Sequence, residues 1–286
     1  MNFGDIDERY SSFDDARFVI IPVPYDLTST YQAGSRRGPE AIIAASCNLE
    51  LYDEELLQET YRSGIHTVAP LVVDARGPEE MLTTIYEEVA KIISYDKIPV
   101  LLGGEHTLSV GSVRALAEKH PSLSVLQLDA HADMRDSYQN TPFSHATVGR
   151  RIFEICPLVQ AGIRSMSKEE AVFIKHNNIK ILTPEEIEDS PDWIEEVVDG
   201  LSDDVYVSID IDALDPSVMP ATGTPEPGGI RWRDILRLIK KVSDVCTIRG
   251  FDVAELCPIP GMVAPDFTAA KLIYRVMGYI DSKNNR

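Results

Sequence analysis

Short apolar runs, rich in β-branched residues, recur along the chain and are separated by longer amphipathic segments. Seven such runs lie at residues 18–22, 98–102, 124–129, 158–162, 179–182, 205–212 and 247–253. Runs of this length that lack polar alternation are typical of parallel strands buried on both faces. The pattern therefore predicts seven strands of a parallel sheet.

The segments between these runs have the character of helices. Residues 39–53 begin with Pro39, which favours a first helical turn, and residues 78–95, 231–242 and 266–280 carry apolar residues three and four positions apart. Alternating strands and helices predict an α/β fold with helices on both faces of the sheet. No linker-like stretch divides the chain, so we expect residues 1–286 to form a single domain. The Pro- and Gly-rich residues 215–229 are long enough to form a functional loop.

Composition excludes several classes of protein. The chain has 286 residues, of which 44% are hydrophobic and 26% charged, as in one ordinary globular domain. No segment approaches the roughly 18 consecutive apolar residues of a membrane span, so we expect a cytoplasmic protein with no membrane partner. The four cysteines are far apart and form no C-x-x-C pair, which argues against a zinc knuckle or a disulfide framework.

The net charge is strongly negative, with 27 Lys plus Arg against 46 Asp plus Glu and a formal balance of −19. Such a surface repels the phosphates of a nucleic acid and suits a small cationic partner. Solubility alone is the other explanation of the charge.

Three side chains of the metal-ligand type follow the run at residues 124–129. Asp129, His131 and Asp133 occupy every second position, and in extended backbone they would share one face. The alternative is a turn in which an Asp caps a helix while the His packs. Three such groups in register are costly to bury unless a cation compensates them, so the sequence favours a metal site.

Two further segments repeat this arrangement. Asp210 and Asp212 end the run at residues 205–212, and His106 follows the run at residues 98–102 after a Gly pair. Asp215, just beyond, is interpreted as a turn or cap residue and is left out of the ligand set. Two His and four Asp without a thiolate favour Mn²⁺ over structural Zn²⁺, and four carboxylates balance two divalent cations.

Several segments together resemble the signature motifs of the ureohydrolase family, the arginases and agmatinases. They are Gly103-Gly104-Glu105-His106, Asp129-Ala130-His131-Ala132-Asp133, Ser208-Ile209-Asp210-Ile211-Asp212-Ala213-Leu214-Asp215-Pro216, Gly223-Thr224-Pro225-Glu226-Pro227-Gly228-Gly229, Thr28-Ser29-Thr30-Tyr31, Gly38-Pro39-Glu40-Ala41-Ile42 and Asp252-Val253-Ala254-Glu255-Leu256-Cys257-Pro258. The resemblance spans nearly the whole chain and keeps the ligand motifs in order.

The resemblance implies an arginase-like three-layer α/β/α fold around an eight-stranded parallel sheet, two Mn²⁺ per chain, and a homo-oligomer, either a trimer or a hexamer. On the family pattern His106 and Asp133 would bind one metal and His131 and Asp212 the other, while Asp129 and Asp210 would bridge the two. Hydroxide held between the metals would attack the substrate.

Two more residues match functional positions of the family. His145 matches the residue that protonates the leaving amine, although the usual Gly after it is Ala146 here; it could instead be a surface histidine. Glu255 matches the carboxylate that pairs with the substrate guanidinium, and an ordinary structural ion pair is its alternative.

The resemblance implies an agmatinase-type enzyme acting on linear amidine C–N bonds, which releases urea and putrescine in polyamine biosynthesis. The Ser-x-Asn element by which arginases hold the α-carboxylate of arginine is replaced by Thr141-Pro142-Phe143-Ser144 before His145. Asp136 is a candidate partner for an ammonium tail, whereas Arg135 could pair with a carboxylate tail or a structural carboxylate. Arginase, guanidinobutyrase and formiminoglutamase activities stay open, as does a non-catalytic metal- or polyamine-binding protein.

Overall fold

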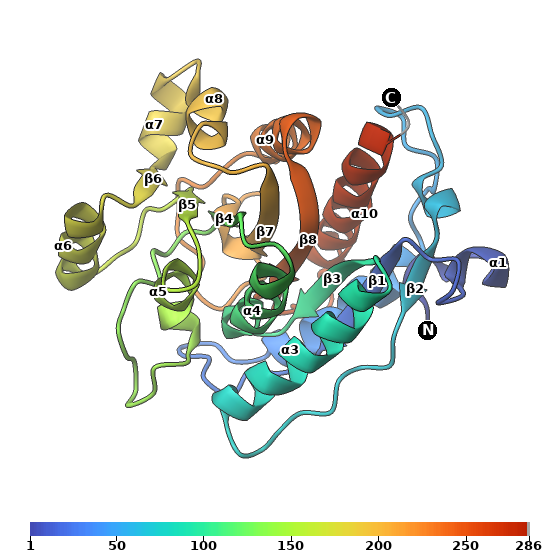
Figure 1. Ribbon diagram of the computed structural model, residues 1–286, viewed down its shortest axis with the longest axis horizontal. Coiled ribbons are helices and arrows are strands. Elements are labelled where there is room, and N and C mark those ends of the chain that lie inside the picture. Colours follow the sequence, from blue (N-terminus) through green and yellow to red (C-terminus); the bar gives the residue numbers. More distant parts are fainter. Residues whose placement is uncertain (285–286) are drawn as a thin grey trace.

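The eight strands found among the described residues lie in one parallel sheet (Figure 1). The computed structural model describes residues 1–284. The strands are β1 (Phe18–Val23), β2 (Ile65–Thr67), β3 (Ile98–Gly103), β4 (Leu123–Leu128), β5 (Leu158–Ala161), β6 (Lys180–Leu182), β7 (Asp204–Asp210) and β8 (Thr247–Ala254). Their order across the sheet is β2-β1-β3-β8-β7-β4-β5-β6. The parallel sheet and its seven predicted strands are confirmed, and β2 is the strand that the apolar pattern missed.

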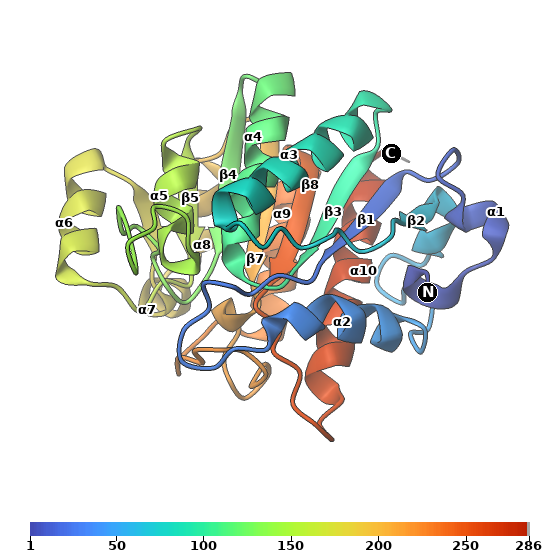
Figure 2. The same cartoon turned by 90° about the horizontal axis from the view of Figure 1, so that it is seen from below.

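Helices cover both faces of the sheet. They are α1 (Glu8–Ser11), α2 (Gly38–Ser46), α3 (Pro78–Ser94), α4 (Ser109–Lys119), α5 (Val148–Phe153), α6 (Lys168–Asn177), α7 (Pro184–Asp189), α8 (Trp193–Val198), α9 (Trp232–Val245) and α10 (Ala264–Asn284). Figure 2 shows α3 and α4 on one side of the sheet and α2 and α10 on the other. This is the expected three-layer arrangement. No helix within residues 1–284 is long and apolar enough to span a membrane.

Alternating side chains of several strands pack in two separate hydrophobic cores. In β1, Phe18 and Ile20 pack in the core beneath α2, α9 and α10, whereas Val19 and Ile21 pack in the core beneath α3, α4 and α5. Both sets are fully buried. A strand with apolar neighbours on both faces shows no polar alternation, which explains the continuous runs in the sequence.

One predicted helix is shorter than expected. Residues 39–53 were expected to be helical throughout, but α2 ends at Ser46. The chain then turns, and the buried carboxylate of Asp53 lies 2.7 Å from Arg275 Nε on α10. A buried carboxylate requires such a partner, and reaching it takes the chain off the helical path.

The topology brings the predicted ligand segments together. β3, β8, β7 and β4 are neighbours in the middle of the sheet, although they come from distant parts of the sequence. In parallel α/β sheets, sites open at the carboxyl ends of the strands, where the connections leave the sheet. The residues following these four strands therefore meet at one edge.

Candidate metal centre and active site

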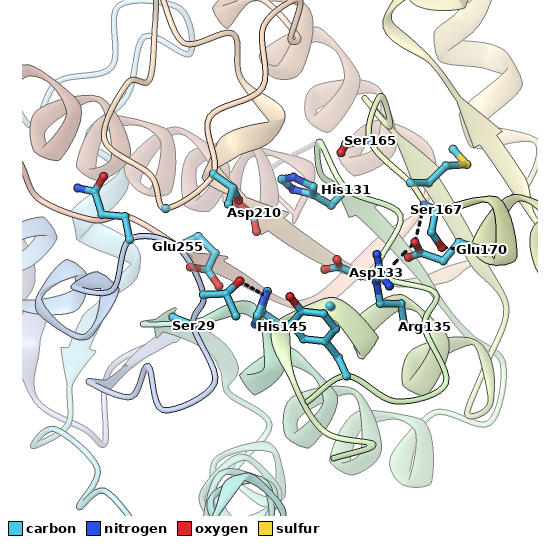
Figure 3. A pocket seen from close by; sticks show the side chains of 17 residues that line it. Ser29, His131, Asp133, Arg135, His145, Ser165, Ser167, Glu170, Asp210 and Glu255 are labelled. Carbon is cyan, nitrogen blue, oxygen red and sulfur yellow. Dashed lines mark hydrogen bonds and ion pairs between the residues drawn. The ribbon is translucent and has the colours of Figure 1, made fainter. Parts of the chain in front are cut away.

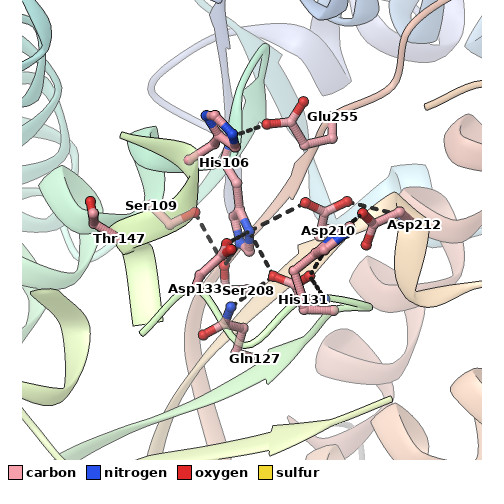
Figure 4. A network of polar contacts seen from close by, with 12 residues as sticks. His106, Ser109, Gln127, His131, Asp133, Thr147, Ser208, Asp210, Asp212 and Glu255 are labelled. Carbon is pink, nitrogen blue, oxygen red and sulfur yellow. Dashed lines mark hydrogen bonds and ion pairs between the residues drawn. The ribbon is translucent and has the colours of Figure 1, made fainter. Parts of the chain in front are cut away.

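The six predicted ligands gather at this edge of the sheet, and Figure 4 labels all of them except Asp129. His106 begins the 3-10 helix η4 (His106–Leu108) after β3, and Asp129 follows β4 directly. Asp210 is the last residue of β7, and Asp212 lies in the 3-10 helix η6 (Ile211–Ala213). Each side chain therefore stands on a rigid strand end or on the turn that follows it.

The local geometry of these segments differs from the expected extended backbone. β4 and β7 end before most of the ligands, and Asp133 has a left-handed φ of 53°. Instead, each first carboxylate folds back on its own chain: Asp129 Oδ1 accepts from the His131 N–H at 2.7 Å, and Asp210 Oδ1 accepts from the Asp212 N–H at 2.9 Å. Such turns, rather than strand alternation, bring the paired side chains to one place.

The ligand atoms form two groups that share Asp129. One group contains His106, Asp129 and Asp210, the other Asp129, His131 and Asp212, and within each group the atoms lie within 4.8 Å of one another. Asp133 approaches the first group, with its Oδ2 atom 3.7 Å from His106 Nδ1. The structure thus brings all six residues together.

The surroundings of His106 Nδ1 indicate whether a cation fits between the ligands. His106 Nδ1 is buried and has no hydrogen-bond partner among residues 1–284. It nevertheless lies 3.0 Å from Asp129 Oδ2 and 3.4 Å from Asp210 Oδ2. A nitrogen that bonds none of the oxygens around it is arranged as a co-ligand of a cation shared with them. Nitrogen and hard carboxylate oxygens without sulfur suit a divalent ion such as Mn²⁺.

The carboxylates also require positive charge. Burial, followed by the charge of Asp129, raises the pKa of Asp133 to about 7. Burial and the neighbouring Asp212 and Asp129 likewise raise the pKa of Asp210 well above its usual value. Buried like charges at this spacing do not all ionise without a counter-ion, so the electrostatics also fit bound cations.

Buried polar side chains that were not predicted hold the ligands in place. Ser208 Oγ lies 2.8 Å from His106 Nε2 and donates toward Asp252 Oδ1 at 3.1 Å. The Gln127 amide donates to Asp129 Oδ2 at 2.7 Å. Gln127 and Ser208 precede ligands on β4 and β7, and Asp252 lies on β8, but residue type and spacing alone do not show these roles, because they arise from contacts between strands.

A cavity of about 300 Å³ opens beside this cluster (Figure 3). Its wall combines predicted ligands with other, mostly polar, residues from seven separate segments: Ser29, Thr30, Gln32, His131, Asp133, Arg135, Tyr138, His145, Ala146, Ser165, Met166, Ser167, Glu170, Asp210, Gly223, Thr224 and Glu255. Gly223 and Thr224 belong to residues 215–229, so the predicted functional loop does reach the pocket. A pocket with converging polar groups next to a metal cluster is the natural place for a substrate.

His145 lines this pocket at the start of the 3-10 helix η5 (His145–Thr147). Its Nε2 atom lies 3.2 Å from the Thr30 hydroxyl, and its Nδ1 atom is buried without a hydrogen-bond partner in the described chain. Burial, followed by the positive charge of His131, lowers the pKa of His145 to about 4, which leaves the imidazole neutral near pH 7. A neutral imidazole in this position must accept a proton before it can donate one.

Glu255 reaches the same pocket from the end of β8. It has a left-handed φ of 64°, and its N–H donates to Gly104 O at 2.7 Å. One carboxylate oxygen accepts from the His106 N–H at 2.7 Å. Burial, followed by the charge of Glu105, raises the pKa of Glu255 to about 8. A cation placed against this carboxylate would favour its ionised form.

The two residues considered for the substrate tail are both engaged elsewhere. Asp136 is exposed, does not line the pocket, and pairs with Arg151 at 2.8 Å. Arg135 does line the pocket, but its guanidinium faces Glu170 Oε2 at 3.8 Å and stacks 5.3 Å from the centroid of the Tyr138 ring. The structural explanation of Arg135 therefore prevails, and Asp136 does not face a substrate here.

Known proteins place the chain in a family. The sequence profile of the arginase family matches residues 16–278. The N(1)-aminopropylagmatine ureohydrolase of Synechocystis sp. is 38% identical over 280 residues, which cover 95% of this chain and 92% of that protein. The agmatinase of Pyrococcus horikoshii is 32% identical, with 94% and 97% covered. The solved structure of the agmatine ureohydrolase of Thermoplasma volcanium has a TM-score of 0.90 and 31% identity, covering 100% of this chain and 97% of that one. The chain therefore belongs to the arginase family of ureohydrolases, and the resemblance inferred from its motifs is confirmed.

Proposed function

We propose that the chain is an agmatinase-type ureohydrolase that hydrolyses the guanidinium group of a cationic, carboxylate-free substrate to urea and an amine. The observation that carries this proposal is the convergence of six ligand side chains with His145 and Glu255 around one pocket. A protein that only retains metal has no need of a further partly buried imidazole and a partly buried carboxylate in the wall of a cavity beside the ligands, as His145 and Glu255 are here. The geometry therefore favours catalysis over mere retention of metal.

Two Mn²⁺ ions are the proposed cofactors. They would be held by the six side chains that gather at the carboxyl edge of the sheet. Asp129 belongs to both groups of ligand atoms and would therefore serve both ions. Bound divalent metal supplies a nucleophile at neutral pH by lowering the pKa of water from 15.7 to about 7. The proposed ligand set is His106, Asp129, His131, Asp133, Asp210 and Asp212.

The remaining steps fall to the side chains of the pocket wall. Glu255 would pair with the substrate guanidinium and hold its carbon toward the cluster, an arrangement that planar guanidinium and carboxylate groups favour. His145 would take up a proton and pass it to the leaving amine, which departs poorly without one. Both groups line the same cavity, so one bound substrate can reach them together.

Agmatine and N(1)-aminopropylagmatine both fit this pocket chemically, because each ends in ammonium and lacks a carboxylate. Hydrolysis would yield putrescine from agmatine and spermidine from N(1)-aminopropylagmatine. The loop before His145 favours agmatine over arginine but does not distinguish these two amines. The higher identity to the Synechocystis enzyme, 38% against 32% for the Pyrococcus agmatinase, favours the longer substrate. We therefore rank N(1)-aminopropylagmatine first and agmatine second.

A urea-release assay with Mn²⁺ tests the proposal. We expect kcat/KM for N(1)-aminopropylagmatine and for agmatine to exceed that for arginine by at least roughly 100-fold, equivalent to about 2.7 kcal/mol in transition-state binding. Chelation should abolish activity, and metal analysis should find two ions per chain. Comparable rates with arginine, a preference for guanidinobutyrate, or release of formamide from formiminoglutamate in a separate assay, would overturn the substrate assignment. Absence of urea from every guanidine would favour a non-catalytic binding protein.

A further inference from the structure

Glu105 is a buried carboxylate that the proposed chemistry does not use. It is fully buried next to His106, yet its oxygens bond outside the ligand cluster. Glu105 Oε2 accepts from the Thr28 N–H, and Oε1 accepts from the Thr28 hydroxyl, each at 2.7 Å. Burial raises the pKa of Glu105 to about 7. The group is thus costly to bury, and both of its carboxylate oxygens accept hydrogen bonds from Thr28.

That segment contacts His145 at two points. The Thr28 hydroxyl accepts from the His145 backbone N–H at 3.3 Å, and the Thr30 hydroxyl lies 3.2 Å from His145 Nε2. A threonine hydroxyl has one proton and two lone pairs. Because the Thr28 proton points to Glu105, a lone pair is left for His145. The direction of both hydrogen bonds at the Thr28 hydroxyl is therefore fixed, whereas the direction of the Thr30 contact follows the tautomer of the imidazole.

The base of this chain of contacts is held rigidly. The Glu105 N–H donates to Tyr25 O at 2.8 Å, and the Gly104 N–H donates to Val23 O at 3.0 Å. The backbones approach so closely that a Cβ atom on Gly104 would lie 2.0 Å from Tyr25 O. On the other side of the loop, Asp26 accepts from the Gly34 N–H at 3.0 Å. The backbone of Glu105 is thus held by the residues at and just after the end of β1, and its side chain binds the loop around Thr28, which Asp26 also holds through Gly34.

From this geometry we propose that Glu105 is a positioning residue that acts through Thr28 to fix His145 in the pocket. The inference rests on the proposed function, since it assumes that His145 moves a proton in turnover. The inference explains why Glu105 and Thr28 stand in the motifs at residues 103–106 and 28–31, although neither side chain is proposed to bind the metal or the guanidinium. A bond network of this kind controls the angle of the imidazole rather than its identity, and misplacement by about 1 Å can reduce a rate about 100-fold.

Substitutions at Thr28 test the connection. Thr28→Val keeps the shape of the side chain but removes the hydroxyl, whereas Thr28→Ser keeps the hydroxyl. We expect Thr28→Val to lower kcat by at least about 10-fold with KM and bound metal unchanged, and Thr28→Ser to remain within about 3-fold of wild type. Glu105→Gln, which has one acceptor oxygen for two donors, should behave like Thr28→Val. A Thr28→Val enzyme with full kcat, or a Thr28→Ser enzyme as slow as Thr28→Val, would overturn the inference.

A double-mutant cycle with His145→Ala separates positioning from a general structural effect. If Thr28 acts only through His145, then Thr28→Val combined with His145→Ala should be no slower than His145→Ala alone, because groups that act as a unit are non-additive. If the losses of kcat in the two single variants multiply in the double variant, the positioning role is wrong, while the proposed function is unaffected. A His145→Ala enzyme with wild-type kcat would instead contradict the proton-transfer role on which the inference depends.

Discussion

The two ring nitrogens of His106 have different neighbours, and this asymmetry makes a prediction at the scale of one residue. Nε2 faces Ser208 Oγ, which in turn faces Asp252, so the Nε2 proton is held and Nδ1 is left free for the cluster. Second partners of metal-binding histidines typically change metal affinity 10- to 100-fold when they are removed. We expect Ser208→Ala to weaken Mn²⁺ binding by about 10-fold or more, measured by calorimetry with the metal alone.

A matched serine provides the control. Ser124 is also buried and lies on the adjacent strand β4, but its hydroxyl accepts from the Ser202 N–H at 2.9 Å, away from the cluster. Ser124→Ala should reduce stability without changing Mn²⁺ affinity. Equal losses of affinity in the two variants would show that Ser208 supports the fold and does not orient His106.

At the scale of an element, one carboxylate organises the loop at residues 215–229. Asp215 Oδ1 accepts from the Ser217 N–H at 2.9 Å, and Oδ2 accepts from the N–H groups of Gly228 and Gly229 at 2.9 and 3.1 Å. Asp215 therefore closes the two ends of the loop, as its interpretation as a turn residue predicted. The loop carries Glu226, whose carboxylate lies 3.9 Å from His131 Nε2.

Asp215 gives the loop a defined pH dependence. Hydrogen bonds from the Ser217 hydroxyl and N–H, with those of the two glycines, lower its pKa from 3.8 to about 2. Because the folded pKa lies below the unfolded one, the stabilisation is complete above about pH 4 and is lost as the pH falls toward 2. Asp215→Asn has one acceptor oxygen for these donors, so it should be less stable than wild type at neutral pH.

Urea unfolding of wild type and Asp215→Asn at several pH values measures this effect. The difference in unfolding free energy should be constant between about pH 5 and 8 and should shrink below about pH 4, where the wild-type carboxylate becomes protonated. A difference that persists unchanged to the lowest pH, or no difference at pH 7, would contradict the role of Asp215.

The elements that the sequence predicted well are those whose signal is local. The central strands were expected to within two residues of their observed ends, because β3, β4 and β7 place apolar side chains in both cores and β8 places three in one of them. The missed strand β2 has three residues, pairs only with β1 at the edge of the sheet, and has one fully buried side chain, Ile65. An edge strand of this length lacks a pattern that distinguishes it from a loop.

The same distinction applies to the site. The six ligands could be predicted because their residue types and spacing are unusual in themselves. Glu105, Thr28 and Ser208 could not be assigned a role, because each contacts a residue far away in the sequence. The separation is 77 positions from Glu105 to Thr28, 117 from Thr28 to His145 and 102 from Ser208 to His106. Asp136 failed as a substrate partner since its ion pair with Arg151 depends on how the following helix packs. Contacts between segments, rather than composition, determine these roles.

At the scale of the whole molecule, the excess of negative charge should help to attract a cationic substrate to the pocket. The formal charge of −19 creates a field that concentrates cations near the protein, and dissolved salt screens it over about 10 Å at 0.1 M. Agmatine carries two positive charges and N(1)-aminopropylagmatine carries three. The field should therefore assist capture of the longer substrate more strongly, independently of any contact in the pocket.

Salt dependence of the steady-state rates measures this contribution. Raising NaCl from about 0.02 to 0.5 M shortens the screening length several-fold, so kcat/KM for both substrates should fall, and more steeply for N(1)-aminopropylagmatine. By contrast, kcat at saturation should change little, because the carboxylates of Asp129, Asp210 and Asp212 beside the reacting group are buried from the salt. Tetramethylammonium chloride in place of NaCl serves as a control against specific binding of sodium. Equal slopes for the two substrates would assign the preference for the longer one to contacts within the pocket alone, and a fall in kcat that matches the fall in kcat/KM would show that salt acts on the site itself.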